Sequence, residues 1–454
     1  MLSSNHMEAQ QNIVENLDRI SDLPDNIIHH ILSFLLIKDV IRTSFLSKRW
    51  RYIWTSVPTL EFDGLVFSPK TKFMNFIDSV LLHRSGPGIQ TFSLRFGGYY
   101  CDSSHLDSWF LAAANHNVRE LSISSHTGEA FELPSCIFTC NSLTVLKLNL
   151  YNSVVNLPSI VHLPFLKRLQ LTSVTFSEDG WNQIFRNSPM LEDVIMEDCY
   201  AENLRPLQIS SSSLRNLIID GLLKEHNYCL LNHEIRVYSP RLLSLKFTGY
   251  AEKSIYVENM SSLIDATIDL KFNFGVRAEI DSNYLIKFLE GISHTKVLTL
   301  SSSSIEVLCE TSTLLGKTFT FSRLNHLKLT AAVNKETVKR VTFVLHSSPK
   351  LEFLSIDFFL RRQGINEEES FEPQTTAFEY CVDNLKVVKI KGFRGNENEI
   401  ALVKSLLENA KILEKMIIVF LKQISANSKL QNQIYLDILL HPRGSPSSEV
   451  VCEF

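Results

Sequence analysis

The sequence of 454 residues lacks features that point to several common classes of protein. Its eight cysteines include no CxxC pair and no paired Cys/His set, so neither a zinc site nor a disulfide framework is indicated. The net charge of −4 supplies no strong field to attract nucleic acid or anionic lipid. We expect free, mostly buried thiols in a reducing compartment, in the cytoplasm, the nucleus or both, with no metal and no cofactor.

Long apolar runs are also missing. The first 18 residues, MLSSNHMEAQQNIVENLD, are polar and contain no apolar stretch of the kind found in secretory signals. The longest candidate for a membrane span, IIHHILSFLLI at 27–37, has 11 residues and two histidines, whereas a membrane span needs about 20 apolar residues. We expect this run to form a buried helix, and we expect no membrane among the partners.

Complete catalytic motifs are absent as well. TSTLLGKT at 311–318 resembles the end of a phosphate-binding loop, but Thr311 stands where the motif requires its first glycine. No GxSxG or HExxH sequence occurs, and the adjacent His29 and His30 would face different sides of a helix. We therefore expect a protein that binds partners and is not itself an enzyme.

The first strongly patterned stretch is SDLPDNIIHHILSFLLIKDVIRTSFLSKRWRYIW at 21–54. Asp22 can cap a first helix, in which apolar residues recur at helical spacing: Ile27, Ile28, Ile31, Leu32 and Leu35. A second helix is expected near Lys38-Asp39, with Val40, Ile41 and Phe45 as its apolar positions. Ser47 can cap a third helix, on which one face carries Trp50, Ile53 and Trp54.

These three helices offer more large apolar groups than they can bury. About 40 residues make too small a core to stand alone. Lys48, Arg49 and Arg51 fall mostly off the apolar face of the third helix, so we expect them on its solvated side. An interface shared with a partner is the place we expect for the excess apolar surface.

The Leu-Pro opening followed by TSFLSKRWRYIW resembles the plant form of the F-box, over about residues 17–63. The resemblance implies docking to the small adaptor subunit of an SCF-type cullin–RING ubiquitin ligase and, through it, to the cullin. The residues expected at the adaptor are Leu23, Pro24, Ile31, Leu46, Trp50 and Trp54. Many relatives have Pro-Thr or Pro-Met between the first two helices, where this chain has Leu36-Ile37, so the turn is less preorganised here.

The rest of the chain repeats the template LxxLxL with conservative swaps. The clear copies begin at Leu143, Leu166, Leu191, Leu214, Leu242, Leu324, Leu351 and Leu385. Weaker copies begin near Ile89, Val118, Leu263, Thr295 and Leu413. Successive starts lie 21 to 34 residues apart, a spacing that fits leucine-rich repeats of ~20–29 residues.

Each copy of the template predicts one short strand. The second and third template positions point into the core and the residues between them point out. One such unit cannot bury its own apolar face, so neighbours must stack. Helices that would form the opposite wall are expected at 73–84, 106–117, 180–188, 282–292 and 337–347. Among the clear copies only Cys199 occupies the turn position where the repeat family usually has Asn or Cys, so we expect irregular curvature.

The segment 384–420 predicts a strand, a glycine-containing turn, a helix and a strand. Asn396 or Asn398 can cap the helix, and its apolar stripe consists of Leu402, Leu406 and Leu407. The segment resembles the FBD module of plant proteins, in which the matching positions are Gly395, Glu399, Asn409-Ala410 and Met416. Phe371 stands where that pattern has tryptophan. The alternative interpretation is that these residues are simply the last repeats followed by a cap.

The fold class expected is therefore α/β, in three parts. A short all-α F-box of three helices occupies 17–63, an irregular leucine-rich-repeat solenoid with a parallel sheet occupies 64–370, and an FBD-type strand–helix–strand cap occupies 371–454. The family resemblance implies a non-catalytic substrate receptor for ubiquitination. The open alternatives are a repeat scaffold or interaction protein outside any ligase, or a hormone-assisted co-receptor.

We expect the target protein on the concave face of the solenoid, at outward strand positions. The residues expected there are Arg168, Gln170, Thr172, Asp193, Ile195, Glu197, Asn216, Ile218 and Asp220. Adjacent isoleucines favour a binding surface over a merely solvated sheet face, which is the other interpretation. Outward charges of both signs along the clear repeats predict no nucleic acid among the partners.

Overall fold

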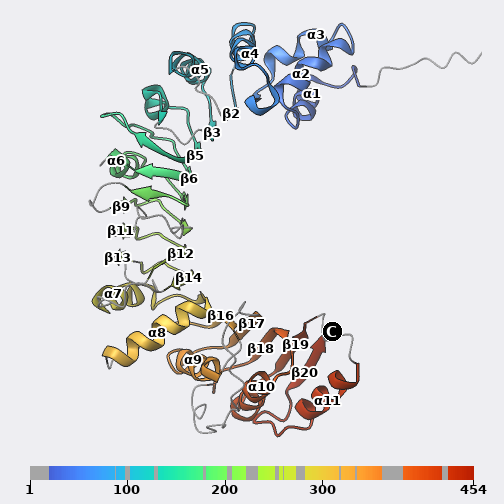
Figure 1. Cartoon of the computed structure of the whole chain (residues 1–454), viewed down its shortest axis with the longest axis vertical. Helices are drawn as coiled ribbons and strands as arrows, with labels where there is room; N and C mark the ends of the chain where they lie inside the picture. The colour runs from blue at the N-terminus through green and yellow to red at the C-terminus, as the bar shows by residue number, and fades with distance from the viewer. Residues whose placement is uncertain are drawn as a thin grey trace, which may run out of the picture. The chain divides into compact units, whose positions relative to one another are not determined.

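The structure of the chain is a computed structural model that describes residues 20–453 except for several segments. Those segments are residues 87, 98–102, 127–130, 177–179, 202–206, 221–233, 251–254, 259, 272–281, 316–318, 333–334, 360–381 and 422–427. The chain divides into two compact units, Met1–Ser122 and Ile123–Phe454. Figure 1 shows the helices and strands of both units along the chain.

The first unit opens with the three short helices that the sequence predicts. The helices and 3-10 turns are α1 (Asp25–Leu32), α2 (Ile37–Arg42), η1 (Thr43–Phe45), α3 (Trp50–Ile53) and η2 (Trp54–Ser56). Their buried apolar side chains are Ile28, Leu32, Ile37, Val40, Trp50 and Ile53. The predicted cap at Asp22 is wrong, because α1 begins at Asp25 with Pro24 at its N-cap and without a side-chain bond there.

The apolar run 27–37 does not form the single buried helix that the sequence predicts. Helix α1 ends at Leu32, and Ile27 and Ile31 on it are exposed. The helix is amphipathic, so residues four apart, here Ile28 and Leu32, face the small core while their neighbours face away from it. The run therefore contributes to the surface as well as to the core.

The remainder of the first unit alternates strands and helices. The elements are β1 (Thr59–Asp63), η3 (Gly64–Val66), α4 (Lys70–Leu82), β2 (Thr91–Phe96) and α5 (Ser103–Asn115). Strands β1 and β2 pair in parallel, from Thr59↔Thr91 to Asp63↔Arg95. Trp109 Nε1 on α5 donates to Asp78 Oδ1 on α4 at 2.6 Å, and these helices confirm the two predicted at 73–84 and 106–117. Strand β3 (Glu120–Ser125) follows at the boundary between the units.

The second unit is built on a long series of parallel strands. The main strands are β5 (Val145–Asn156), β6 (Arg168–Phe176), β7 (Asp193–Glu197), β10 (Asn216–Asp220), β12 (Ser244–Tyr250), β14 (Asp265–Lys271), β15 (Val297–Leu300), β16 (His326–Ala332), β17 (Phe353–Phe359), β18 (Val387–Phe393), β19 (Lys415–Phe420) and β20 (Glu449–Glu453). Each pairs in parallel with the next in this order. The two-residue strands β4 (Phe131–Glu132) and β8 (Tyr200–Ala201) extend the pairing of β5 and β6.

Every copy of the LxxLxL template forms a strand that begins one residue before the second leucine of the template. The copy at 166–171 illustrates the arrangement. Leu169 and Leu171 are 0% exposed, whereas Arg168 and Gln170 beside them lie on the outward face. Leu166 is also buried and precedes the strand. The predicted direction of the template side chains is thus confirmed.

Helices and one small sheet form the opposite wall of the second unit. The helical elements are η4 (Ser135–Thr139), α6 (Gly180–Arg186), α7 (Ser282–Ile292), α8 (Ser302–Leu315), α9 (Lys335–His346), α10 (Glu397–Asn409) and α11 (Ser428–Leu439). Helices α6, α7 and α9 confirm the helices predicted at 180–188, 282–292 and 337–347, whereas α8 and α11 were not predicted. Between α6 and α7 the wall is a three-stranded parallel sheet of β9 (Leu207–Ser210), β11 (Ile235–Tyr238) and β13 (Ile255–Glu258).

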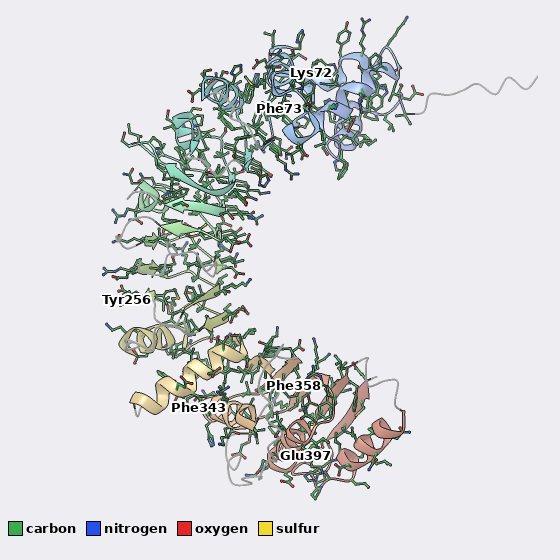
Figure 2. The ribbon with its side chains drawn as sticks, in the orientation of Figure 1. Lys72, Phe73, Tyr256, Phe343, Phe358 and Glu397 are labelled. Carbon is green, nitrogen blue, oxygen red and sulfur yellow. The ribbon has the colours of Figure 1, made fainter. Side chains whose placement is uncertain are left out.

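The small sheet replaces helices because its strands alternate buried and outward residues. Leu207, Ile235 and Ile255 are aligned in register and buried. The residues after them face outward, and Tyr256 lies at the outer wall in Figure 2. Arg236 stacks over its ring with 5.7 Å between the guanidinium carbon and the ring centroid. The sequence analysis missed this sheet, although the period-two pattern of these short runs was its signal.

The predicted strand–turn–helix–strand of the C-terminal segment is confirmed as β18, α10 and β19. The side chain of Asn396 caps α10 by accepting from the Glu399 amide at 2.9 Å. The Glu399 carboxylate is 0% exposed and accepts the amides of Arg394 and Gly395, both at 2.7 Å. Burial raises the pKa of Glu399 above its ordinary value, although these backbone bonds oppose the shift. Phe371 and the expected boundary near 370 lie outside the described residues.

None of the cysteines that the structure describes takes part in a disulfide. They are Cys136, Cys140, Cys199, Cys309 and Cys452. The Cys199 thiol is buried, lies 3.4 Å from the Leu171 carbonyl oxygen, and has its pKa raised by burial to about 12. The thiol therefore bonds the backbone of the neighbouring strand β6, and it also lies 3.5 Å from the Glu197 carbonyl oxygen at the end of β7.

Candidate functional site

The three-helix segment exposes a surplus of large apolar side chains. We call six of them the exposed apolar set: Ile27, Ile31, Phe34, Leu35, Phe45 and Leu46. Phe45 is 89% exposed and Phe34 is 76% exposed, far more than a small domain needs for its own core. The surplus expected from the sequence is therefore present. Side chains of this kind, gathered on one short segment, are typical of a protein–protein interface.

The residues expected at an adaptor fall into two groups. Those at or near the surface are Leu23, Pro24, Ile31, Leu46 and Trp54. Trp50 is different, because its side chain is only 3% exposed and its Nε1 donates to the Ser21 hydroxyl at 3.0 Å. Trp50 thus supports the fold of the segment, and truncating it would remove core volume rather than contact surface.

Sequence reasoning missed the exposure of two phenylalanines. It placed Phe45 among the apolar positions of the second helix and left Phe34 without a role. Helix α2 ends at Arg42 and continues as η1, and a 3-10 turn has three residues per turn instead of 3.6. The change of period turns Phe45 away from the face that buries Val40.

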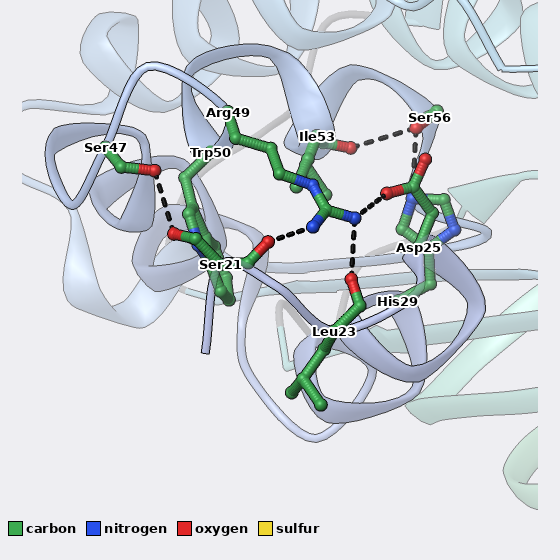
Figure 3. Close-up of polar contacts among 9 residues, drawn as sticks. All are labelled: Ser21, Leu23, Asp25, His29, Ser47, Arg49, Trp50, Ile53 and Ser56. Atoms are coloured by element: carbon green, nitrogen blue, oxygen red, sulfur yellow. Dashed lines mark hydrogen bonds and ion pairs between the residues drawn. The ribbon is translucent and has the colours of Figure 1, made fainter. Parts of the chain in front are cut away.

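An arginine ties the start of the segment to its third helix (Figure 3). The Arg49 guanidinium donates through Nη2 to the Leu23 carbonyl at 2.6 Å and to the Asp25 carboxylate at 2.7 Å. Through Nη1 it also donates to the Ser21 carbonyl. The Leu23-Pro24 opening is therefore held by a fork of bonds from residue 49, and this basic residue is not merely solvated.

Serines complete the same cluster. The Ser47 hydroxyl lies 3.0 Å from the Ser21 hydroxyl, whereas α3 has Arg49 at its N-cap without a side-chain bond. The predicted role of Ser47 as a cap is therefore wrong, since its hydroxyl is engaged with the opening of the segment. Across the helices, the His29 Nε2 atom lies 3.0 Å from the Ser56 hydroxyl.

The turn between α1 and α2 adopts a geometry that suits proline. Leu36 has φ −62° and ψ 144°, close to the φ of about −65° that a proline ring imposes. Its carbonyl accepts the amides of Asp39 and Val40 at 2.8 and 3.0 Å, which starts α2. Ile37 is buried (1% exposed). The turn is therefore formed by leucine and isoleucine in the conformation that proline would favour.

The nine residues expected to bind a target form one grid on the outward face of β6, β7 and β10. The strand registers align three rows: Arg168↔Asp193↔Asn216, Gln170↔Ile195↔Ile218 and Thr172↔Glu197↔Asp220. The sequence alternation alone implied this face, and the in-register pairing is what brings the nine side chains together. We call this set the outward grid.

Polar side chains within the outward grid bond to each other. Arg168 Nη2 lies 3.0 Å from the Asp193 carboxylate, and Asn216 Nδ2 donates to the same carboxylate at 2.6 Å. Asp220 is ion-paired with Lys246 on the neighbouring strand β12. Ile195 and Ile218 lie between these polar rows and are half-buried. The grid is thus an apolar centre bordered by ordered charges of both signs.

Two kinds of site are absent from the described part of the chain. No group of three or more His, Cys, Asp and Glu side chains in it is arranged to hold a metal ion. None of its helices is long and apolar enough to cross a membrane.

Models of known families match most of the chain. A model described as At1g61320/AtMIF1, LRR domain, matches residues 80–435, and the F-box domain model matches residues 20–62. The F-box match covers the exposed apolar set and the Arg49 cluster. The repeat match covers the strands of the outward grid and extends through α10 and β19.

Similar proteins in Arabidopsis thaliana extend over nearly the whole chain. F-box/FBD/LRR-repeat protein At2g26030 is 28% identical over 96% of this chain and 99% of its own length. FBD-associated F-box protein At4g13985 is 29% identical and F-box/LRR-repeat protein 13 is 28% identical, each over 96% of both chains. A solved leucine-rich-repeat protein of Leptospira interrogans has a TM-score of 0.29 at 12% identity, over 86% of this chain and 94% of that one, too low to carry an argument.

Proposed function

The chain belongs to the F-box/FBD/LRR-repeat family, and on that basis we propose that it is a substrate-receptor subunit of an SCF-type cullin–RING ubiquitin ligase. In this proposal the F-box docks on the adaptor subunit and, through it, on the cullin. The repeats hold a target protein, and partner subunits perform the ubiquitin transfer. The chain itself would contribute no catalytic residue.

The observation that carries the proposal is the exposed apolar set on a rigid three-helix segment. Such side chains cost free energy in water unless a partner covers them, at roughly 25 cal/mol per Å² of apolar surface. The F-box match at 20–62 supports the adaptor as the partner that would cover this surface. The Arg49 bonds to Ser21 and Leu23 fix the opening of the segment before any partner arrives.

The mechanism that follows is one of effective concentration. A target held on the repeats while the F-box is docked stays near the activated ubiquitin, so transfer becomes effectively intramolecular. The outward grid suits the holding task, because its half-buried isoleucines offer an apolar centre and its ordered charges offer specificity.

Adaptor affinity tests the docking half of the proposal. Ile31→Ala and Leu46→Ala remove exposed side chains without creating a core cavity, unlike Trp50→Ala. If both contact the adaptor as anchors, each should cost about 2 kcal/mol, a loss of roughly 30-fold in affinity. Lys48→Ala is the matched control on the same segment and should change affinity by less than about twofold. Unchanged binding of both apolar variants would rule out docking through this surface.

A second candidate is a repeat-based interaction protein that never enters a ligase. Leu36-Ile37 favours it, because the F-box resemblance leads us to expect Pro-Thr or Pro-Met at this turn. The φ of Leu36 argues the other way, since the turn has the required conformation without proline. Affinity purification of the tagged full chain from plant cells, probed for adaptor and cullin, separates the two. Recovery of targets without adaptor or cullin would favour the second candidate.

Target recognition is tested on the outward grid. Associated proteins are identified by proximity labelling with the wild-type chain and with an Arg168→Glu, Ile195→Asp double variant. Both side chains lie on the sheet surface, so the fold should survive and the target should be lost. Glu290→Lys on α7, exposed on the opposite wall, is the charge-changing control. Retention of the target by the double variant would place recognition elsewhere on the chain.

A further inference from the structure

The last strand of the second unit has one open edge. β20 (Glu449–Glu453) pairs with β19 in parallel, from Lys415↔Glu449 to Val419↔Glu453. Among the residues that the structure describes, no strand is registered against its other edge, and Figure 1 shows β20 beside β19 at the end of the series. An exposed edge of this kind is a template for the addition of another strand.

The backbone groups at the open edge can be assigned residue by residue. The Glu449 amide donates to the Glu414 carbonyl at 2.9 Å, so the backbone of Glu449 faces β19. Along a strand the backbone groups of successive residues point to alternate edges. Val451 and Glu453 therefore also face β19, whereas Val450 and Cys452 direct their N–H and C=O groups to the open edge.

The side chains of β20 repeat the core pattern but leave it incomplete. On β19, Met416 and Ile418 are 0% exposed. Their register partners on β20, Val450 and Cys452, are only half-buried. The apolar layer of the core thus reaches the open edge without the cover that each preceding strand receives from its neighbour. A further strand would complete both the hydrogen bonds and this layer.

The edge is also held in place before any partner binds. Arg443 Nη1 donates to the Ser448 carbonyl at 2.6 Å, directly before the strand begins. The Ser445 hydroxyl donates to the carbonyl of Leu413, two residues before β19, at 2.8 Å, and this bond fixes the turn that precedes β20. An edge fixed in this way loses little conformational entropy when a strand is added.

Charge decides which strand fits. If two copies of this chain paired antiparallel through β20 about Val451, Glu449 of each copy would face Glu453 of the other. Like charges directly opposite in a sheet are unfavourable, so self-pairing is opposed at both ends, less strongly than for two bare carboxylates because Glu449 Oε2 lies 3.0 Å from Lys415 Nζ on β19. We propose that the open edge of β20 binds an extended segment of a partner protein, with alternating apolar residues between basic residues, as an added strand. The basic residues complement Glu453 and the exposed side of Glu449, whose carboxylate is also ion-paired with Lys415, and the apolar residues cover Val450 and Cys452.

A short peptide tests the proposal on the full chain. The probe is fluorescein-labelled Lys-Val-Thr-Val-Lys, capped at its C-terminus and matched in length to β20, and binding is measured by fluorescence anisotropy. We expect saturable binding, and at least about tenfold weaker binding of Glu-Val-Thr-Val-Glu. Val450→Pro removes an outward N–H without taking a bond from the β19 pairing, and should weaken binding of the lysine peptide at least about tenfold. Val450→Thr keeps the N–H and the branched shape, and should bind like the wild type.

A charge reversal keeps the test decisive if the proline variant does not fold. A Glu449→Lys, Glu453→Lys variant should prefer the glutamate peptide, with the order of the two affinities inverted. Three results would overturn the proposal: no saturable binding of the lysine peptide, equal binding by a folded Val450→Pro variant, or an unchanged preference after charge reversal. Peptide-resistant dimers of the wild-type chain would instead assign the edge to a second copy.

Discussion

Arg49→Ala should weaken adaptor binding even though Arg49 acts within the chain. Its guanidinium donates to the carbonyls of Ser21 and Leu23 and to the carboxylate of Asp25, so it holds the opening that precedes α1. Without these bonds the Leu23-Pro24 stretch would sample other conformations. The adaptor would then bind only the fraction of molecules in which the opening is ordered.

The magnitude follows from the exposure of the groups. A hydrogen bond from a charged donor contributes about 1.5–3 kcal/mol when it is sheltered from water. The Arg49 side chain is 39% exposed, so we take about 1 kcal/mol for each of the two carbonyl bonds. The ion pair adds under about 1 kcal/mol, because the Asp25 side chain is 70% exposed. The two carbonyl bonds together contribute about 2 kcal/mol, and the ion pair raises the upper limit to about 3 kcal/mol, so we expect a loss of affinity of at least ~3-fold and at most ~150-fold.

Isothermal titration of the purified adaptor measures this loss directly. Lys48→Ala, one residue away and equally basic, should keep wild-type affinity within about twofold, since its side chain is exposed. Arg49→Lys should be intermediate, because one ammonium cannot reproduce the planar fork. Circular dichroism and thermal unfolding check that the variants remain folded. Equal affinities for Arg49→Ala and Lys48→Ala would refute the reasoning.

Four further predictions concern stability, reactivity and specificity. Leu36→Pro should stabilise the first unit by about 0.4–1 kcal/mol, because the φ of residue 36 already suits proline; a lower midpoint in urea would contradict this. Glu399→Ala should raise amide exchange of Arg394 and Gly395 at least about tenfold. Because burial raises the pKa of Glu399, the contribution of this side chain to the free energy of unfolding should decrease as pH rises above about 4.3. The Glu399→Ala variant should not show this decrease. Cys199, with a pKa of about 12, should resist iodoacetamide at pH 8 until the chain unfolds, as mass spectrometry would show. Gel shifts should reveal no salt-sensitive nucleic-acid complex, since charges on the outward face are of both signs and two opposite pairs of them, Arg168 with Asp193 and Lys246 with Asp220, are ion-paired.

Local sequence patterns predicted the elements that local physics controls. All thirteen copies of the template became strands, because alternation along a strand decides which side chains are buried whatever lies beside it. The cap of α10 was readable as Asn396 or Asn398 for the same reason, since a cap and its partner lie three residues apart, and the structure selects Asn396 with Glu399. The same reading failed at Asp22 and Ser47. Both are good capping residues by type, but α1 begins at Asp25 and the Ser47 hydroxyl lies against Ser21 instead.

The sequence by itself therefore determined the F-box opening, the repeat period, the strands and the outward direction of the grid residues. Tertiary structure alone decided which side chains come together. The sheet of β9, β11 and β13 joins four-residue strands that lie about 20 to 30 residues apart in the chain. Arg49 reaches Leu23 across 26 residues, and Trp50 is buried against a serine 29 residues away. Periodicity fixes the face on which a residue lies, but the partner across that face is a long-range contact that no local pattern records.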